Sequence, residues 1–198
     1  MIISGGKRTE GLVIATCFFA LGIASDARAE ASRIDATPIF QDGRLTGCSL
    51  VFDVIVQDHR YKAGALTQAS GSVTVWGAEG HIGAGIKLGL ATIAPDSPPF
   101  EKPATAFLVS GLETNAGDLI GTAESPTPGF GNFFYQMSDA TMEGIVAITA
   151  GRLTVGYTRP GGTTAQTFDL NIPAAESADF GECFKRVAQD FLNAAGAE

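Results

Sequence analysis

The stretch 47–57, GCSLVFDVIVQ, decides the fold more than any other part of the chain. Its even-numbered positions from 50 to 56 are all apolar, and on the opposite face Val51 and Ile55 flank Asp53. This period of two predicts a β-strand. Apolar residues on both faces are typical of a strand inside its sheet, so we expect a sheet built around residues 47–57.

Cys48 lies in this stretch and has one partner available in the chain that we expect to be exported. Cys17 falls inside an N-terminal segment that we expect to be removed, which leaves Cys48 and Cys183. An even pair of cysteines in an oxidising compartment predicts a disulfide. Neither cysteine belongs to a CxxC motif or has a histidine nearby, so a reactive thiol or a metal ligand is the less favoured alternative.

Cys183 itself lies in a segment with the spacing of an amphipathic helix. The apolar stripe of this segment comprises Phe180, Cys183, Phe184, Val187, Ala188, Phe191 and Leu192. These positions follow the i, i+3, i+4, i+7 pattern of a helix that buries one face. Ser177 or Asp179 is expected to cap it. The predicted disulfide would therefore fasten a C-terminal helix to the sheet.

The rest of the chain between Cys48 and the helix is rich in strand patterns. Strands are predicted at 61–66, 72–77, 80–94, 104–112, 119–123 and 131–137. Residues 153–158 and 167–172 alternate around Arg159–Gly162, whose Pro-Gly pair predicts a hairpin with a type II turn. The glycines within 80–94 are expected to leave room for a neighbouring backbone or a bulge. Residues 30–43 are polar and mixed, and we expect a loosely held lead-in there.

Residues 139–150 can be interpreted in two ways. Met142, Ile145, Val146 and Thr149 have helical spacing, with Ser138 placed as a cap. Gly144 opposes the helix by about 1 kcal/mol. A short helix is the preferred interpretation, and a strand remains the alternative. The predicted fold class is thus α+β: a mostly antiparallel β-sheet or sandwich with a C-terminal amphipathic helix and one short inner helix.

The N-terminus has the features of a secretory signal peptide. Lys7 and Arg8 precede an apolar run from 12 to 24, which is followed by the small-residue site Ala27–Ala29. The run is shorter than the roughly 20 residues that a membrane-spanning helix needs. We therefore expect residues 1–29 to be a signal peptide and 30–198 to be a single exported domain, periplasmic or secreted, with no transmembrane segment after processing.

Length and charge narrow the possible functions. A chain of 198 residues with 45% hydrophobic residues can bury the core of one domain. It carries 13 Lys and Arg against 21 Asp and Glu, a formal net charge of -8. Nucleic-acid binding needs a basic surface, so we expect no nucleic-acid partner.

Motifs for catalysis, cofactors and metals are absent from the sequence. Residues 30–198 contain no GxSxG, SxxK or phosphate-loop pattern, and His59 and His81 are too far apart for a short-spaced zinc motif. The loop carboxylates Asp96, Glu101, Glu113 and Asp118 lack the spacing of a calcium loop. We therefore assign no catalytic, cofactor-binding or metal-binding residue, and only Cys48 and Cys183 are named as a site.

An aromatic group is the remaining candidate for ligand contact. It comprises Trp76, Phe130, Phe133, Phe134 and Tyr135. Buried, these side chains are core; exposed, they could bind sugars or apolar ligands, and burial is the preferred interpretation. The leading hypothesis is an exported non-catalytic binding or structural module of the cell envelope, with an envelope protein, a glycan or a small ligand as partner. The alternative is a secreted hydrolase that uses loop carboxylates and His59 or His81.

Overall fold

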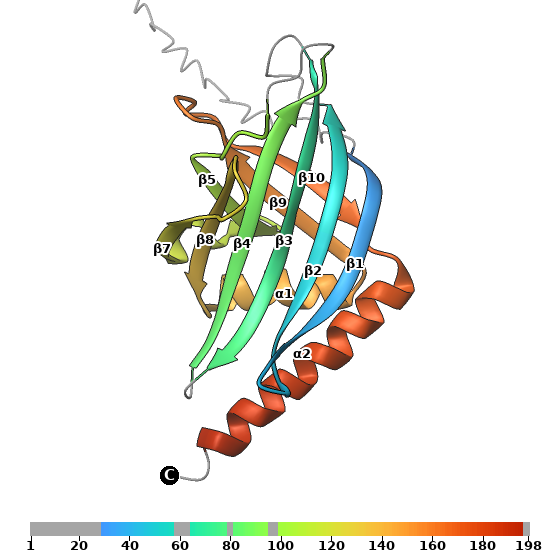
Figure 1. Ribbon diagram of the computed structural model, residues 1–198, viewed down its shortest axis with the longest axis vertical. Helices are drawn as coiled ribbons and strands as arrows, with labels where there is room; N and C mark the ends of the chain where they lie inside the picture. Colours follow the sequence, from blue (N-terminus) through green and yellow to red (C-terminus); the bar gives the residue numbers. More distant parts are fainter. Residues whose placement is uncertain (1–28, 58–63, 79–80, 95–98, 196–198) are drawn as a thin grey trace, which may run out of the picture.

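A six-stranded and a four-stranded antiparallel sheet face each other in the part of the protein that the computed structural model describes, residues 29–57, 64–78, 81–94 and 99–195 (Figure 1). The larger sheet runs, in spatial order, β1 (Ala29–Gln41), β2 (Arg44–Gln57), β3 (Leu66–Ala78), β4 (His81–Thr92), β8 (Phe130–Gln136) and β7 (Leu119–Glu124). The smaller runs β10 (Gln166–Asn171), β9 (Arg152–Thr158), β5 (Thr105–Ser110) and β6 (Glu113–Thr114). The helices are η1 (Asn115–Asp118), α1 (Asp139–Thr149) and α2 (Ala174–Ala195). The predicted α+β class is confirmed.

Strand β2 lies between β1 and β3, inside its sheet as predicted. The side chains at its even positions from 50 to 56 are at most 1% exposed. Phe52 meets Phe168 of β10 edge-on, with ring centroids 5.9 Å apart, so this face of β2 packs against the smaller sheet. On the other face Val51 is partly buried and Ile55 is 38% exposed. Only one apolar face of the strand is therefore in the core.

Strand β1 corrects the expectation of a loose lead-in at 30–43. It pairs with β2 from Ala29 to Gln41 and forms the edge of the larger sheet. An edge strand needs few apolar side chains, because backbone hydrogen bonds hold it and one edge is open. Asp42 and Gly43 both have positive φ, 51° and 78°, as a two-residue Asp-Gly hairpin turn requires.

Most other predicted strands are present, with shifted ends. The segments at 80–94, 104–112, 119–123 and 131–137 correspond to β4, β5, β7 and β8. Separate strands were predicted at 61–66 and 72–77, and this division is wrong. A single strand, β3, runs unbroken from Leu66 to Ala78. The other predicted residues at 61–63, and residues 1–28 of the predicted signal peptide, lie outside the described residues.

The predicted hairpin after residue 152 is confirmed. Strands β9 and β10 pair antiparallel, with Tyr157 opposite Gln166. In the turn, the Gly162 N–H donates to the Arg159 carbonyl oxygen at 3.0 Å, and Gly161 has a φ of +72°. A positive φ at the third position is what a type II turn requires.

The ambiguous segment forms α1, so the preferred helical interpretation is confirmed. Ser138 Oγ caps it by accepting from the Thr141 N–H at 3.1 Å. Gly144 fits this helix for a packing reason. A Cβ there would lie 2.8 Å from Leu108 Cδ1, so the glycine lets α1 approach β5 closely.

Helix α2 begins earlier than predicted. Its first residue is Ala174, directly after Pro173, and Ser177 lies in its first turn instead of capping it. Phe180 and Val187 are at most 2% exposed, but Leu192 near the other end is 65% exposed. The apolar stripe is therefore most buried between Phe180 and Val187, and α2 contacts β1, β2 and α1.

Candidate binding surface

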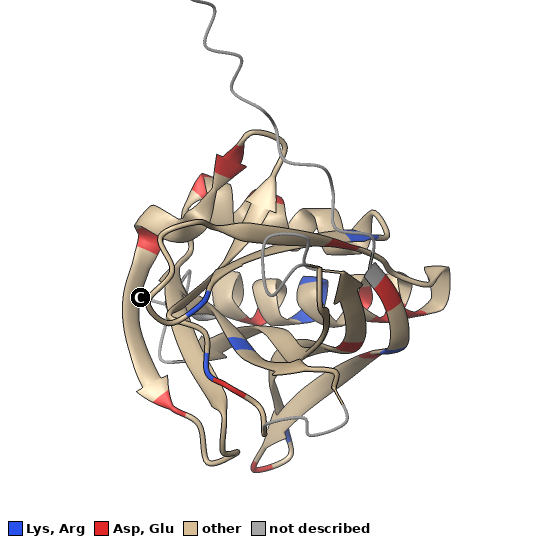
Figure 2. Ribbon diagram, turned by 90° about the horizontal axis from the view of Figure 1, so that it is seen from above, with Lys and Arg blue, Asp and Glu red and all other residues tan. Residues whose placement is uncertain are grey.

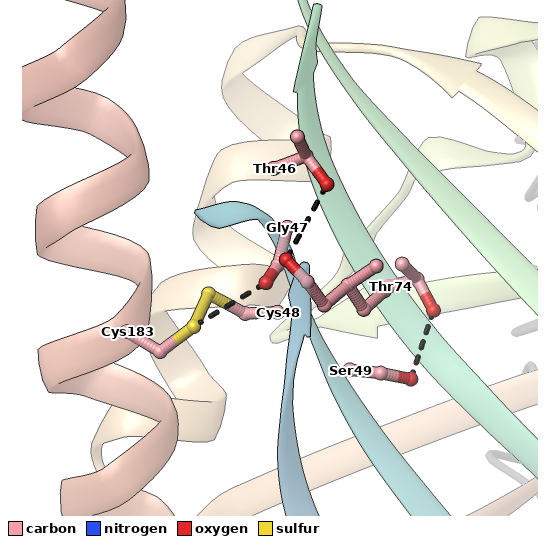
Figure 3. The surroundings of a disulfide bond; sticks show 7 residues. Thr46, Gly47, Cys48, Ser49, Thr74 and Cys183 are labelled. Atoms are coloured by element: carbon pink, nitrogen blue, oxygen red, sulfur yellow. Dashed lines mark hydrogen bonds between the residues drawn. A yellow bond between two sulfur atoms is a disulfide. The ribbon is translucent and has the colours of Figure 1, made fainter. Parts of the chain in front are cut away.

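The disulfide between Cys48 and Cys183 is present and joins β2 to α2 (Figure 3). The sulfur atoms are 2.08 Å apart and the Cα atoms 5.9 Å apart, across a sequence separation of 135. Cys48 is 1% exposed, and Cys183 Sγ lies 3.5 Å from the carbonyl oxygen of Gly47. The bridge therefore sits where the helix meets the inner face of the sheet.

A groove of about 300 Å³ opens beside this disulfide, between the β1–β2 hairpin and α2. Most of its lining is apolar: Ala36, Pro38, Phe40, Leu45, Cys48, Phe180 and Cys183. Asp179, Glu182 and Arg186 of α2 supply its charged groups. At Ala36, which lines the groove, the backbone N–H donates to Glu176 Oε2 at 2.6 Å. This hydrogen bond joins one amide of the edge strand β1 to helix α2.

The aromatic residues of β8 divide between the two faces of the sheet. Phe133 and Tyr135 are each 1% exposed in the core. Burial raises the pKa of the Tyr135 phenol, whose O–H donates to the Ala106 carbonyl oxygen. Phe130 and Phe134, on the opposite face, are only partly buried. Phe133 and Tyr135 are therefore core residues, whereas Phe130 and Phe134 remain partly accessible for ligand contact.

Trp76 and Phe134 form an open aromatic surface with the strand beneath them. A Cβ on Gly83 would lie 2.6 Å from Trp76 Cζ2, and one on Gly85 would lie 2.9 Å from Cζ3. The indole therefore lies across both glycines of β4. Phe134 stands against it at an interplanar angle of 85°, with ring centroids 5.8 Å apart. We call Trp76, Phe134, Gly83 and Gly85 the aromatic platform.

This arrangement corrects the expectation for the glycines of 80–94. They were expected to admit a backbone or a bulge, but the pairing of β3 with β4 is regular from Ala78–His81 to Thr67–Thr92. The space is filled by side-chain rings instead. Gly89 likewise leaves room for an aromatic ring, because a Cβ there would lie 2.9 Å from the ring of Phe130.

Phe130 belongs to a second aromatic pair on the same face of the sheet. Its ring centroid is 4.9 Å from that of Phe100, and Lys87 Nζ lies 5.1 Å from the same ring. Lys87 also donates to Thr127 Oγ1 at 2.9 Å, so its ammonium is held over this pair. A cation therefore lies over this pair, whereas the described contacts place none over the aromatic platform.

Uncharged polar side chains lie beside the platform on the same face. The strand register places Thr74 opposite Gly85 and Gln136 opposite Gly83. Thr74 Oγ1 lies 2.9 Å from Ser49 Oγ, on the side of the sheet away from Cys183 (Figure 3). Exposed His81 shares this face of β4, two residues before Gly83.

The titratable residues weighed for hydrolysis are not gathered into one cluster. His59 and Asp96 lie outside the described residues, and Glu113 is exposed on β6. His81 begins β4, whereas Glu101 pairs with Leu90 near its other end, about 30 Å along the strand.

Asp118 serves the start of α1, because it accepts from Ser138 Oγ and from Gln136 Nε2. Within the described ranges, no group of three or more His, Cys, Asp or Glu side chains is placed to hold a metal ion.

Charge is spread thinly over the described chain. Figure 2 shows Lys and Arg as separate patches among the acidic residues, with no strand or helix that is mainly basic. None of the helices in the described ranges combines the length and apolarity required to cross a membrane.

These features define the protein as a disulfide-bonded antiparallel β-sandwich with an open aromatic platform on its larger sheet. Comparison of the chain with protein-family models, with curated proteins and with solved structures finds no match.

Proposed function

We propose that the protein is an exported, non-catalytic binding module of the cell envelope that contacts its ligand through the aromatic platform. The observation that carries this proposal is the indole of Trp76, laid across two glycines and left partly open. A large ring that the fold already holds in place loses little freedom on binding. Tryptophan is also enriched among the residues that dominate binding energy.

Two features support export to the periplasm or the medium. The basic, apolar and small-residue segments of 1–29 have the order of a signal peptide. The Cys48–Cys183 disulfide is of the kind that persists in oxidising compartments. Intact-mass measurement of the exported protein should give a chain that begins at Glu30 with both cysteines oxidised. A full-length chain recovered with free thiols would contradict export.

We favour a non-catalytic role because His81 and Glu101 lie near opposite ends of β4. The partner classes that fit are an envelope protein, a glycan or a small ligand. Nucleic acid is not proposed, because the chain carries a net charge of -8.

Oxidative labelling of Trp76 in intact cells tests the binding role. The chain contains one tryptophan, so its labelled peptide reports on the platform alone. We expect Trp76 to be labelled less in the envelope than in the purified protein, because bound ligand covers the indole. Phe40, 57% exposed at the β1–β2 hairpin, is the internal control and should be labelled alike in both samples. Equal labelling of Trp76 in both samples would refute the proposal.

A further inference from the structure

We infer that the aromatic platform binds a sugar ring of a neutral saccharide. This inference rests on the proposed binding role and names its ligand class. It follows from three properties of the platform: the orientation of the indole, the position of Phe134, and the absence of charge at the neighbouring register positions of β2, β3, β4 and β8.

The indole lies flat on the sheet. Cζ2, Cε2 and Nε1 of Trp76 are 2.6–2.9 Å from a Cβ built on Gly83, and Cζ3 and Cη2 are 2.9–3.3 Å from one built on Gly85. A ring whose atoms keep similar heights above two points of one strand lies parallel to that strand. One π-face therefore covers the glycines, while Trp76 as a whole stays partly exposed.

A flat π-face suits the C–H-rich face of a pyranose. The ring quadrupole of tryptophan is negative over its face and attracts weakly positive C–H groups. Phe134 stands nearly perpendicular to the indole, so the two rings form a corner. A corner restricts where the sugar sits and in which direction its substituents point.

Hydrogen-bonding groups surround this corner as a hydroxyl-rich ligand requires. Thr74, Gln136 and His81 lie beside the indole on the same face. Gln136 Nε2 donates to Asp118 Oδ1 at 3.3 Å, which leaves the amide oxygen to accept from a ligand hydroxyl. An apolar floor with a few placed polar groups is the usual composition of a small-molecule site.

Charge complementarity favours a neutral saccharide over an anionic one. The outward positions next to Trp76 on β2, β3 and β8 are Ser49, Thr74, Phe134 and Gln136, all uncharged, and the charged group that contacts them is the Asp118 carboxylate bound to Gln136. Lys87, the nearest cation along this face of β4, is held by Thr127 and Phe130. The net charge of -8 repels acidic ligands further.

Titration of the purified protein with neutral tetrasaccharides of glucose, mannose and N-acetylglucosamine tests the inference. Because Trp76 is the sole tryptophan, intrinsic fluorescence reports on the platform directly, and calorimetry gives an independent affinity. At least one probe should produce a saturable spectral shift at millimolar concentration. Failure of all probes to bind, or tighter binding of an acidic tetrasaccharide, would overturn the inference.

Two variants and two matched controls locate the site. Trp76→Leu removes the indole, whereas Gly83→Ala keeps every platform side chain but places a methyl 2.6 Å from it, so the ring must move. Both should weaken binding by about tenfold or more. Gly117→Ala, where a Cβ meets no atom within 4 Å, and Phe40→Ser should bind as the wild type does.

Calorimetric binding by Trp76→Leu at wild-type affinity would refute the platform as the site. Gly83→Ala gives the answer if Trp76→Leu does not fold. If no saccharide probe binds but Trp76 is protected from labelling in cells, the ligand class is refuted and the binding role stands. Unprotected Trp76 in cells would refute the binding role itself.

Discussion

The Cys48–Cys183 disulfide should be a large contributor to stability that one substitution can remove. The bridge closes a loop with a sequence separation of 135 residues. In the chain-entropy treatment, a loop of this length destabilises the unfolded state by about 5 kcal/mol at room temperature. Strain in the native state and residual structure in the unfolded state both reduce that figure. Replacement of Cys183 by Ser is therefore expected to lower the free energy of unfolding by about 2–5 kcal/mol.

The helix itself should stay docked in this variant. Phe180 and Val187 are at most 2% exposed, and burial of each contributes roughly 1.5–3 kcal/mol. The loss therefore acts mainly through the unfolded chain and not through detachment of α2. Far-ultraviolet circular dichroism at low temperature should match that of the wild type.

Urea denaturation monitored by Trp76 fluorescence measures the effect. The midpoint should fall in Cys183→Ser, and the melting temperature should fall by roughly 4–20 °C. The fully reduced wild type is the control, because it loses the bridge without a substitution and should behave in the same way. A reduced wild type and a variant that both unfold at the oxidised midpoint would show that the bridge does not stabilise the fold.

Three further variants test the core. Tyr135→Phe removes the hydrogen bond to the Ala106 carbonyl oxygen and should lower the free energy of unfolding by about 0.5–1.5 kcal/mol. It should also make the free energy of unfolding depend less on pH in alkaline solution. Burial raises the pKa of Tyr135, so the folded state holds this proton longer than the unfolded state and stability falls as the pH rises above about 10. Gly144→Ala should destabilise by about 1–3 kcal/mol despite better helix propensity, because its Cβ would lie 2.8 Å from Leu108 Cδ1. Asn115→Ala should cost about 1–3 kcal/mol, because the buried Leu108 N–H donates to Asn115 Oδ1 at 2.7 Å.

Each of these variants has a comparison within the same chain. Gly117→Ala introduces the same methyl into open space and should change stability little. Asn171→Ala removes an exposed amide and serves the same purpose for Asn115. Denaturation midpoints equal to those of these controls would contradict the packing of α1 on β5 and the role of the buried amide. If the free energy of unfolding of Tyr135→Phe still falls above about pH 10 as steeply as that of the wild type, the raised pKa of the Tyr135 phenol is contradicted.

The sequence patterns predicted the elements with a strong apolar periodicity. They missed strand β1, which is held in the sheet mainly by backbone hydrogen bonds. The alternation in 47–57 identified β2, and the i, i+3, i+4 pattern identified α2. Strand β1 has a mixed composition because it is an edge, so its apolar pattern is weak. The Asp42-Gly43 pair was the available signal for its hairpin, and a strand on either side of that turn follows from it.

The aromatic platform could not be derived from the sequence, because its parts meet only through strand register. Trp76 lies opposite Gly83 on β4, and Phe134 lies opposite Gly85 across the next pair of strands. The sequence showed that glycines leave space in 80–94. Which ring fills that space depends on pairings that no local pattern specifies. Cys48 and Cys183 were different, because the expected removal of Cys17 left each with one possible partner.

The chain order of the bridged residues sets an order for folding as the chain is released from its N-terminus. Strands β1 to β4 are consecutive and pair with their neighbours in sequence, so they can form a meander before the rest of the chain is available. Their inner face, with Phe52 and Ile86, then waits for β9, β10 and α2, which emerge last. Until then it is an exposed apolar sheet of the kind that aggregates. The disulfide can form only after Cys183 is available, so it cannot guide the pairing of β1 to β4. Thiol trapping of chains during synthesis should find Cys48 free until residues 174–195 have emerged.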